Sequence, residues 1–550
     1  MKKINLAIAQ DIKEIKFIQK RYKNSLKWLP LNLETLLYFD QNNLDYVKIG
    51  RYISNSFHKK GILASLKITS IIDKHPFQEK SLQHRYKGII RKFFNSAYFL
   101  IEALKCIKKN FLVNEIVLSG WNNYNDLSIK NNYIVSSIFK NLFFNRENLN
   151  LLSKIKENKN QKLYSFRFLY KNSNNKKILL SDLNYNFIRI IFSNFLKGNK
   201  IYLIDFDENK SLKKNLLKLM GVNFIKFEKK IEKKQKKIKF QKLNFTYDGK
   251  DFSKLLSLRA NQIQNSLINL NSKNQAISKL FYNFRPDLII LNNVRGINYK
   301  ISELSKKYKL KSILLSHGTL TKGKNKFEKI YQNIISEELI NNNIRYLGLQ
   351  TKLIQSSLKT IKFKGEIIKT GNIIFSEKKS ENKKYFLYAV TQRDFVNMHF
   401  YGIEMFYEFY NNLKILDVIS KDHSYKIKVK LHPNINYLAR NLKTKFKNIE
   451  FSNENIQNLI SKAIATISFS STVIDESLCS HTPVILYDPQ SRYNHNFLKN
   501  NDTVNYANNK NILIKLMKKM INSKNLNFNN YIYNGNSKKN IQNNLLNLIY

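Results

Sequence analysis

The fold of this chain is decided by three segments of its second half, KIKVKLHPN (426–434), ISFSSTVIDESL (467–478) and HTPVILYDP (481–489). Each predicts a buried strand, with apolar residues alternating with lysines in the first segment and short apolar runs in the other two. Polar turns follow the first two runs, His432-Pro433 in one case and the hydroxyl-rich residues 468–472 in the other. Ligands of open α/β sheets bind at the carboxyl ends of strands, so these turns predict a ligand site.

Strand and helix patterns alternate on both sides of this stretch. With YFLYAVTQ (385–392) and IEFSNE (449–454), the second half has five strands separated by helices, which predicts a complete doubly wound domain. Upstream, LIILNN (288–293) and SILLSHGTL (312–320) flank a helix and form a βαβ unit. We therefore predict an α/β chain of two Rossmann-like domains that face each other across a cleft. The first spans residues 1–375 and includes an N-terminal elaboration, and the second spans 376–550.

The net charge of the chain is strongly positive. Its 550 residues include 95 Lys and Arg against 39 Asp and Glu, a net charge of +56. Such an excess indicates an anionic partner, which could be nucleic acid, an anionic membrane surface or a phosphate-bearing substrate. The lysines are spread along a sequence rich in Asn, Ile, Phe and Tyr, a composition that an AT-rich genome would also encode. Both origins of the charge stay open.

Cysteine usage and hydrophobic runs indicate a cytoplasmic protein. Cys106 and Cys479 lie far apart, which favours neither a disulfide framework nor a zinc cluster. No stretch approaches the roughly 20 apolar residues of a membrane helix, so we expect membrane contact only by the surface, at the inner face of the plasma membrane. Neither GxGxxG nor GxxxxGK[ST] follows a strand, and the nine histidines are scattered. We expect no bound cofactor and no metal site.

Residues 285–490 resemble the GT-B glycosyltransferases of bacterial surface and capsular polysaccharide synthesis. The resemblance depends on the order of four short motifs, His317-Gly318-Thr319, Thr370-Gly371-Asn372, Lys430-Leu431-His432-Pro433 and Ser470-Ser471-Thr472, followed by Glu476 and Pro483. The same order occurs in polysialyltransferases and CDP-glycerol glycerophosphotransferases. The resemblance implies a metal-independent GT-B enzyme with a nucleotide-sugar donor, plausibly a cytidine nucleotide, and a glycan or lipid-linked acceptor.

The C-terminal motifs have a chemistry suited to donor binding. The imidazole of His432, held by the rigid Pro433, can donate a hydrogen bond or a positive charge to a phosphate. Ser470, Ser471 and Thr472 lie where a strand gives way to a helix, and hydroxyls and backbone N–H groups at a helix N-terminus bind phosphate. The alternatives are a histidine that only satisfies its turn and an ordinary helix cap.

Three further donor contacts are implied by the resemblance. In the resembling families an acid at the position of Glu476 contacts the donor ribose or sugar, although a solvent-facing helix carboxylate is the alternative here. Gly371 and Asn372, between the two predicted halves, belong to the same motif series and are assigned to donor binding on that basis.

Two residues of the first half are candidates for catalysis. His317 follows a strand, and Gly318 allows close approach, which suits a general base that deprotonates an acceptor hydroxyl. Asp248 partly matches the acid-acid-glycine motif of bacterial sialyltransferases, but the first acid is missing and Asp-Gly is common in turns.

These features predict a glycosyltransferase. One alternative is a basic nucleic-acid-binding protein, which should show clustered basic and aromatic residues or a known module; none is visible, so no nucleic-acid partner is expected. The other alternative is a GT-B scaffold without activity.

Overall fold

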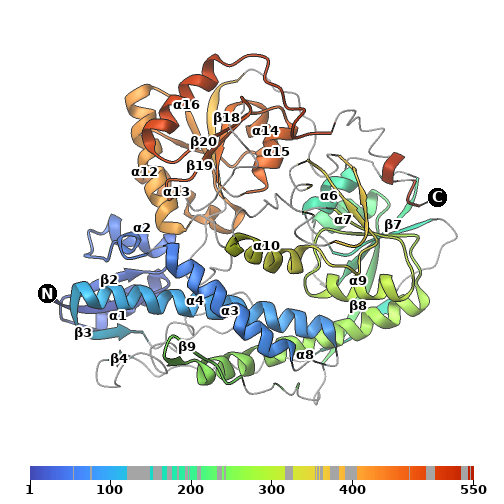
Figure 1. Cartoon of the computed structure of the whole chain (residues 1–550), viewed down its shortest axis with the longest axis horizontal. Helices are drawn as coiled ribbons and strands as arrows, with labels where there is room; N and C mark the ends of the chain where they lie inside the picture. The colour runs from blue at the N-terminus through green and yellow to red at the C-terminus, as the bar shows by residue number, and fades with distance from the viewer. Residues whose placement is uncertain are drawn as a thin grey trace. The chain divides into compact units, whose positions relative to one another are not determined.

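The computed structural model describes all residues except 54, 75–76, 78, 120–148, 153–163, 170–175, 183–184, 193–195, 197, 207–211, 232–237, 239, 241–242, 316–325, 353–354, 356–357, 359–362, 372–382, 391–404, 470, 491–501, 534–542, 546 and 550. The chain forms two compact units. Figure 1 labels the helices and strands and colours them in chain order from blue to red. The first unit consists of Met1–Gln161, Lys236–Leu267 and Val390–Asn453, and the second of Lys162–Gln235, Ile268–Ala389 and Glu454–Tyr550.

The first unit contains a parallel four-stranded sheet in the order β2-β1-β3-β4. Its strands are β1 (Lys2–Ala9), β2 (Lys27–Pro30), β3 (Phe111–Leu118) and β4 (Leu149–Leu151). Asp11 and Asn32 cap the N-termini of helices α1 (Ile12–Arg21) and α2 (Leu33–Gln41). Each side chain accepts a hydrogen bond from a backbone N–H of the first turn. This cap satisfies one of the donors that a helix start leaves open.

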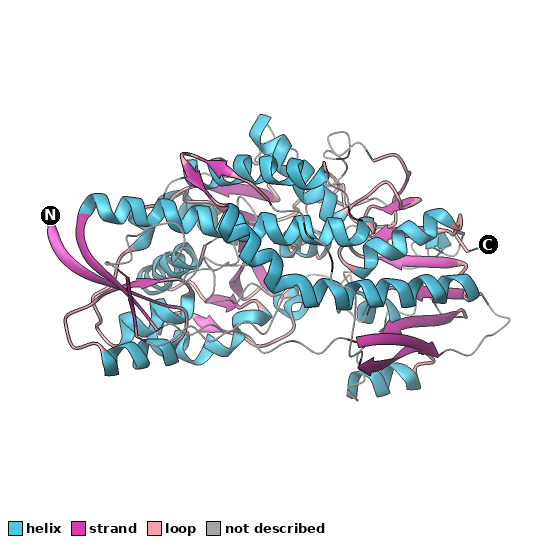
Figure 2. Ribbon diagram, turned by 90° about the horizontal axis from the view of Figure 1, so that it is seen from below, coloured by secondary structure: helices cyan, strands magenta, loops and turns pink. Residues whose placement is uncertain are grey.

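The residues that the structure describes include three long helices, α3 (Asn55–Asp73) and α4 (Lys80–Asn110) in the first unit and α8 (Ser253–Asn283), whose residues 253–267 belong to the first unit and 268–283 to the second. Figure 2 draws the helices in cyan. The rings of Phe94 in α4 and Phe252, just before α8, pack edge to face with centroids 4.9 Å apart. The buried guanidinium of Arg259 lies 5.5 Å from the centroid of the Phe93 ring. Aromatic side chains therefore fix α4 against the start of α8.

The second unit contains an eight-stranded sheet in the order β14-β13-β12-β11-β6-β7-β8-β5. Its strands are β5 (Tyr164–Leu169), β6 (Lys177–Leu180), β7 (Lys200–Asp205), β8 (Asn223–Ile231), β11 (Leu288–Leu291), β12 (Ser312–Leu315), β13 (Tyr346–Gly348) and β14 (Glu366–Ile368). Only the edge strand β5 is antiparallel to its neighbour among the described pairs.

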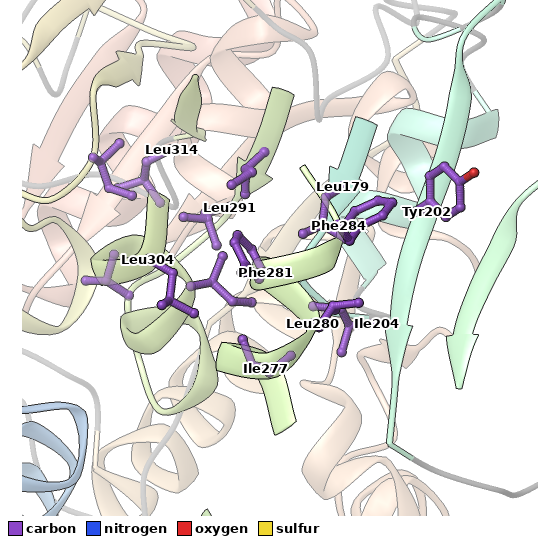
Figure 3. Packing of buried hydrophobic residues seen from close by; sticks show 14 of the residues in the cluster. Leu179, Tyr202, Ile204, Ile277, Leu280, Phe281, Phe284, Leu291, Leu304 and Leu314 are labelled. Carbon is purple, nitrogen blue, oxygen red and sulfur yellow. The ribbon is translucent and has the colours of Figure 1, made fainter. Parts of the chain in front are cut away.

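Both faces of this second sheet are covered, which explains its continuous apolar runs. Phe281 of α8 and Phe284, which follows the helix, pack on one face among Leu179 and Leu291 of the strands (Figure 3). The opposite face packs against α6 (Tyr185–Phe192), α7 (Leu212–Leu219) and the C-terminal residues Leu545 and Ile549. The C-terminal sequence IQNNLLNLIY (541–550) predicts packing against one half of the chain, and its residues Leu545 and Ile549 do pack here.

A third sheet has the strand order β17-β16-β15-β18-β19-β20. Its strands are β15 (Tyr385–Ala389), β16 (Ile427–Lys430), β17 (Glu450–Phe451), β18 (Ala463–Ser468), β19 (Val484–Tyr487) and β20 (Val504–Ala507). Helices α12 (Phe406–His423), α13 (Ala439–Lys445), α14 (Ile456–Ser461), α15 (Val473–Cys479) and α16 (Lys510–Asn522) alternate with them. The order is the 3-2-1-4-5-6 arrangement of the Rossmann fold, with β15 as the first strand.

The predicted α/β class with doubly wound parallel sheets is confirmed. The structure adds the four-stranded N-terminal sheet, which the sequence indicated only as an elaboration. β2 and β4 contain 4 and 3 residues, too few for a periodic pattern. The boundary near residue 375 stays a prediction. Residues 126–142, whose sequence also predicts a helix, lie outside the described residues. Among the helices that the structure describes, none combines the length and the apolar character that crossing a membrane requires.

Candidate functional site

The third sheet reverses its strand order between β15 and β18. From β15 the chain continues to β16 and β17 on one side and then starts β18 on the other side. Such a switch point opens a crevice at the carboxyl ends of the two strands, where α/β proteins bind ligands. The Ser468 hydroxyl donates a hydrogen bond of 2.7 Å to the Ala389 carbonyl and ties these two strand ends together.

The predicted hydroxyl turn lies directly after this switch point, between β18 and α15. Ser471 uses its hydroxyl locally, because Oγ accepts a hydrogen bond of 3.3 Å from the N–H of Val473. Thr472 has helical backbone angles, and its side chain makes no cap. Within the described residues the half-buried Thr472 hydroxyl makes no hydrogen bond, so it is available to a ligand. A capping box is not formed here, whereas Ser470 lies outside the described residues.

Helix α15 places two acids in its first turn, Asp475 and Glu476. Both are buried, with 4% and 7% of their surface exposed. The alternative of Glu476 as a solvent-facing carboxylate is therefore wrong. Negative charge near a helix N-terminus is favourable, and it also makes the same turn less attractive to a bare phosphate.

Asp475 connects α15 to the second sheet. Its Oδ1 accepts a hydrogen bond of 2.9 Å from the hydroxyl of Thr351, a residue that follows β13. Thr351 is itself buried, with 4% of its surface exposed. Cys479, at the other end of α15, packs in the same apolar cluster as Leu315 and Tyr346 of the second sheet. The carboxyl ends of β13 and β18 therefore meet through one buried hydrogen bond.

Gly371 follows β14, the strand that pairs with β13. Its N–H donates to the Leu349 carbonyl at 3.1 Å, and the Thr370 hydroxyl donates to the same oxygen at 3.2 Å. The backbone φ angle of Gly371 is +67°, a value that favours glycine. The residue is buried, and its backbone geometry accounts for its identity; a donor contact stays a prediction. Asn372 lies outside the described residues.

A second switch point, which the sequence did not reveal, lies in the second sheet between β6 and β11. Polar residues follow both strands: Ser181 and Asp182 after β6, and Asn292 and Asn293 after β11. Ser181 is buried, and its Oγ has no hydrogen-bond partner among the residues that the structure describes. The strand ends could be read from the sequence, but only the strand order shows that they are neighbours.

A charged pair stands next to this second switch point. Arg295 lies two residues after Asn293, and its backbone N–H donates a hydrogen bond of 3.0 Å to Asn293 Oδ1. Its Nε lies 3.0 Å from Glu338 Oε2, and the Arg295 side chain is 34% exposed. A partly exposed guanidinium beside amide groups can hold an oxygen-rich ligand.

His432 belongs to the first unit. It precedes the 3-10 helix Pro433–Leu438, and its Nδ1 accepts a hydrogen bond of 3.3 Å from the Asn434 N–H. The neutral imidazole must then carry its proton on Nε2 and can donate from that atom. The turn role that the sequence offered as an alternative is therefore present, and a donor-binding role for His432 and the exposed Pro433 stays a prediction.

Asp248 also belongs to the first unit and forms the turn of a hairpin between β9 (Thr246–Tyr247) and β10 (Lys250–Asp251). Asp248 and Gly249 both have positive φ angles, +52° and +70°, as a two-residue type I′ hairpin requires. Oδ2 of Asp248 lies 3.3 Å from Lys105 Nζ. Turn geometry explains the Asp-Gly pair, and a catalytic role for Asp248 stays a prediction.

The structure thus brings Thr472 and Glu476 to the switch point of the third sheet, with α15 linked to the strand beside that of Gly371. His317 lies outside the described residues. Among the described residues, no cluster of three or more His, Cys, Asp or Glu side chains could hold a metal ion.

No family model and no curated protein matches this chain. Solved structures with some similarity include the UDP-GlcNAc 2-epimerase of Methanocaldococcus jannaschii in complex with UDP-GlcNAc and UDP, at 15% identity and a TM-score of 0.43, over 68% of this chain and 99% of that one. Another is the epimerase of Neisseria meningitidis bound to UDP-GlcNAc, at 12% identity and a TM-score of 0.40, over 68% and 100%. The wall teichoic acid polymerase TagF matches at 13% identity and a TM-score of 0.38, over 68% and 88%. At these scores we transfer no residue role from these proteins.

Proposed function

We propose that the chain is a glycosyltransferase that moves a sugar, or a related polyol phosphate, from a nucleotide-activated donor to a bacterial surface-glycan or lipid-linked acceptor. The hydrogen bond from Thr351 to Asp475 supports this most, because it joins the carboxyl ends of two parallel sheets. A transferase has to hold donor and acceptor next to each other. Two switch points of the strand order in one unit suit that requirement. The cytidine base is proposed from the sequence resemblance alone.

The donor site in this proposal is the switch point between β15 and β18. The Thr472 hydroxyl would donate to a phosphate oxygen. Glu476 would accept hydrogen bonds from ribose or sugar hydroxyls, because a carboxylate repels the phosphate itself. Ser470 and Ser471 would complete the turn.

His432 would provide a further donor to the nucleotide from its Nε2 atom. The bond from Asn434 to Nδ1 fixes the tautomer that makes Nε2 the donating nitrogen. Gly371 and Asn372 would contact the donor from the side of the second sheet.

The acceptor would bind at the switch point between β6 and β11, where Asn292, Asn293 and Arg295 can hold hydroxyl or carboxylate groups. In the transfer step the acceptor hydroxyl oxygen forms a bond to the anomeric carbon. The bond from that carbon to the phosphate oxygen breaks, and the nucleotide leaves with its electron pair. His317 would accept the hydroxyl proton, with Asp248 as the second candidate.

A thermal-shift screen against CMP, CDP, UDP, GDP and their sugars tests the proposal, because a ligand stabilises the folded state in proportion to its affinity and concentration. We expect stabilisation by cytidine nucleotides, which His432→Ala reduces. His423→Ala, at an exposed histidine of the same unit, is the matched control. Stabilisation by no nucleotide would refute the proposal.

The charge of +56 is the observation that favours the alternative of a nucleic-acid-binding protein. That alternative predicts tight binding to generic DNA that weakens steeply with salt, without nucleotide-sugar binding. Nucleotide binding without turnover on any acceptor would instead favour a scaffold that has lost activity.

A further inference from the structure

Helix α7 exposes an apolar face. Leu212, Leu216 and Leu219 are spaced four and three residues apart, so they lie on one side of the helix. Leu212 and Leu219 are 89% and 85% exposed, and Leu216 and Met220 are exposed as well. The remaining leucine, Leu217, is buried in the core beside the second sheet. The helix is therefore anchored by Leu217 and turns its other leucines to solvent.

These four side chains, the α7 patch, stand out from the rest of the described surface. All four lie within residues 212–220. The other large apolar side chains that the described residues expose are more widely separated along the chain. Exposed apolar residues that occur singly are ordinary, whereas a contiguous group indicates an interaction site.

The charges around the α7 patch are positive. Helix α7 has the sequence LKKNLLKL and contains no acid. Lys213 is exposed and makes no ion pair among the described residues, and Lys218 lies over the Phe224 ring at 6.0 Å. Lys214 is engaged, with Nζ 2.7 Å from Asp205. Lys213 and Lys218 thus place two cations beside exposed leucines.

We propose that the α7 patch docks on an anionic lipid bilayer. An interfacial helix buries leucines at the boundary of the acyl chains and places lysines among anionic headgroups, and α7 presents both kinds of residue. Self-association through the same patch would bring the lysines of two copies together. One eight-residue helix also offers little area compared with the roughly 1,000 Å² or more that a stable protein interface buries. The proposal does not depend on the proposed transferase activity.

Vesicle co-sedimentation of the full chain tests this docking. The vesicles are phosphatidylcholine alone, or phosphatidylcholine with a third of phosphatidylglycerol. We expect binding to the anionic vesicles, and Lys213→Glu with Lys218→Glu should weaken it by about 25-fold or more, since each lysine near an anionic leaflet contributes about a factor of five. Leu212→Ser with Leu219→Ser should weaken it by at least about tenfold, because those side chains then no longer favour the acyl region.

Helix α16 provides matched controls in the same unit. Lys515→Glu with Lys518→Glu makes the same charge change at two exposed lysines, and Ile512→Ser with Ile521→Ser removes two exposed apolar side chains. Both control pairs should change vesicle binding by less than about threefold, because single charges away from the contact are screened. Circular dichroism verifies that each variant is folded.

Three results would overturn the proposal. One is unchanged vesicle binding by the leucine variant. Another is a loss of vesicle binding by Lys515→Glu with Lys518→Glu that equals the loss by the lysine variant of α7, which would assign binding to the diffuse charge of the chain. The third is a concentration-dependent dimer in sedimentation that the leucine variant dissociates without any loss of vesicle binding, which would assign the patch to a second copy of the chain.

Discussion

Replacement of Thr351 by valine tests the connection between the two sheets. Valine keeps the shape of threonine and removes the hydroxyl that donates to Asp475 Oδ1 at 2.9 Å. Both residues are 4% exposed, so water cannot readily replace the lost donor. Hydrogen bonds to charged groups contribute about 1.5–3 kcal/mol, and we expect Thr351→Val to lower the free energy of unfolding by about 2 kcal/mol.

Thr482→Val is the matched control in the same unit. The fully buried Thr482 hydroxyl donates to the Ile460 carbonyl at 3.0 Å, a neutral acceptor. A bond of this kind contributes about 1 kcal/mol. Urea unfolding of the two variants should therefore differ by about 1 kcal/mol at an unchanged m-value, with Thr351→Val the less stable.

A double-mutant cycle with Asp475→Asn completes the test. Residues that bond directly show a coupling energy of about 0.5–3 kcal/mol, so the double variant should lose less stability than the sum of the single variants. The affinity for the nucleotide provides a second measurement, because Asp475 lies in the first turn of α15 at the proposed nucleotide site. Strict additivity, or a loss for Thr351→Val no larger than for Thr482→Val, would refute the connection.

Other contacts give three further expectations. Tyr410→Phe should cost about 1.5 kcal/mol of unfolding free energy and Tyr46→Phe less, because their hydroxyls lie 2.7 and 3.3 Å from the Asp40 carboxylate; equal losses in urea unfolding would contradict this. Burial alone would raise the pKa of Asp40, but the hydrogen bonds from Lys445 and Tyr410 outweigh it and hold that pKa below its usual value. The stability deficit of Asp40→Asn should therefore be constant above about pH 5 and disappear as the pH falls through the lowered pKa, and a deficit that grows in acid would be inconsistent with this. Gly348→Ala should destabilise by about 1–3 kcal/mol in thermal unfolding, since a Cβ there would lie 3.0 Å from two neighbouring side chains; a fully stable variant would show that the strands can shift.

Much of the fold could be predicted from the sequence because it is encoded locally. β18 and β19 are largely apolar and buried, β16 alternates apolar residues with lysines, and all three end in polar turns, so the strands could be predicted from local sequence. The N-terminal sheet could not be predicted in the same way. Its outer strands are too short to show a period, and their pairing with β1 and β3 depends on contacts distant in sequence.

The candidate site divides in the same manner. The hydroxyls at 471–472 and the acid Glu476 were identified because a strand end and a helix start coincide there. The partner of Asp475 is 124 residues away in Thr351, and no local pattern indicates it. The second switch point likewise requires the strand order, because β6 and β11 are adjacent in space although more than 100 residues separate them in the chain.

The central claim is that the switch point between β15 and β18 binds a nucleotide-activated donor. Calorimetric titration of CMP and CDP into the wild-type chain and into Thr472→Val tests it most directly, with Thr246→Val, at an exposed threonine of β9, as the control. We expect wild type and the control to bind alike, and Thr472→Val to bind about tenfold more weakly, the effect of one lost hydrogen bond to a phosphate. Equal affinity of all three proteins, or no binding to any of them, would contradict the claim.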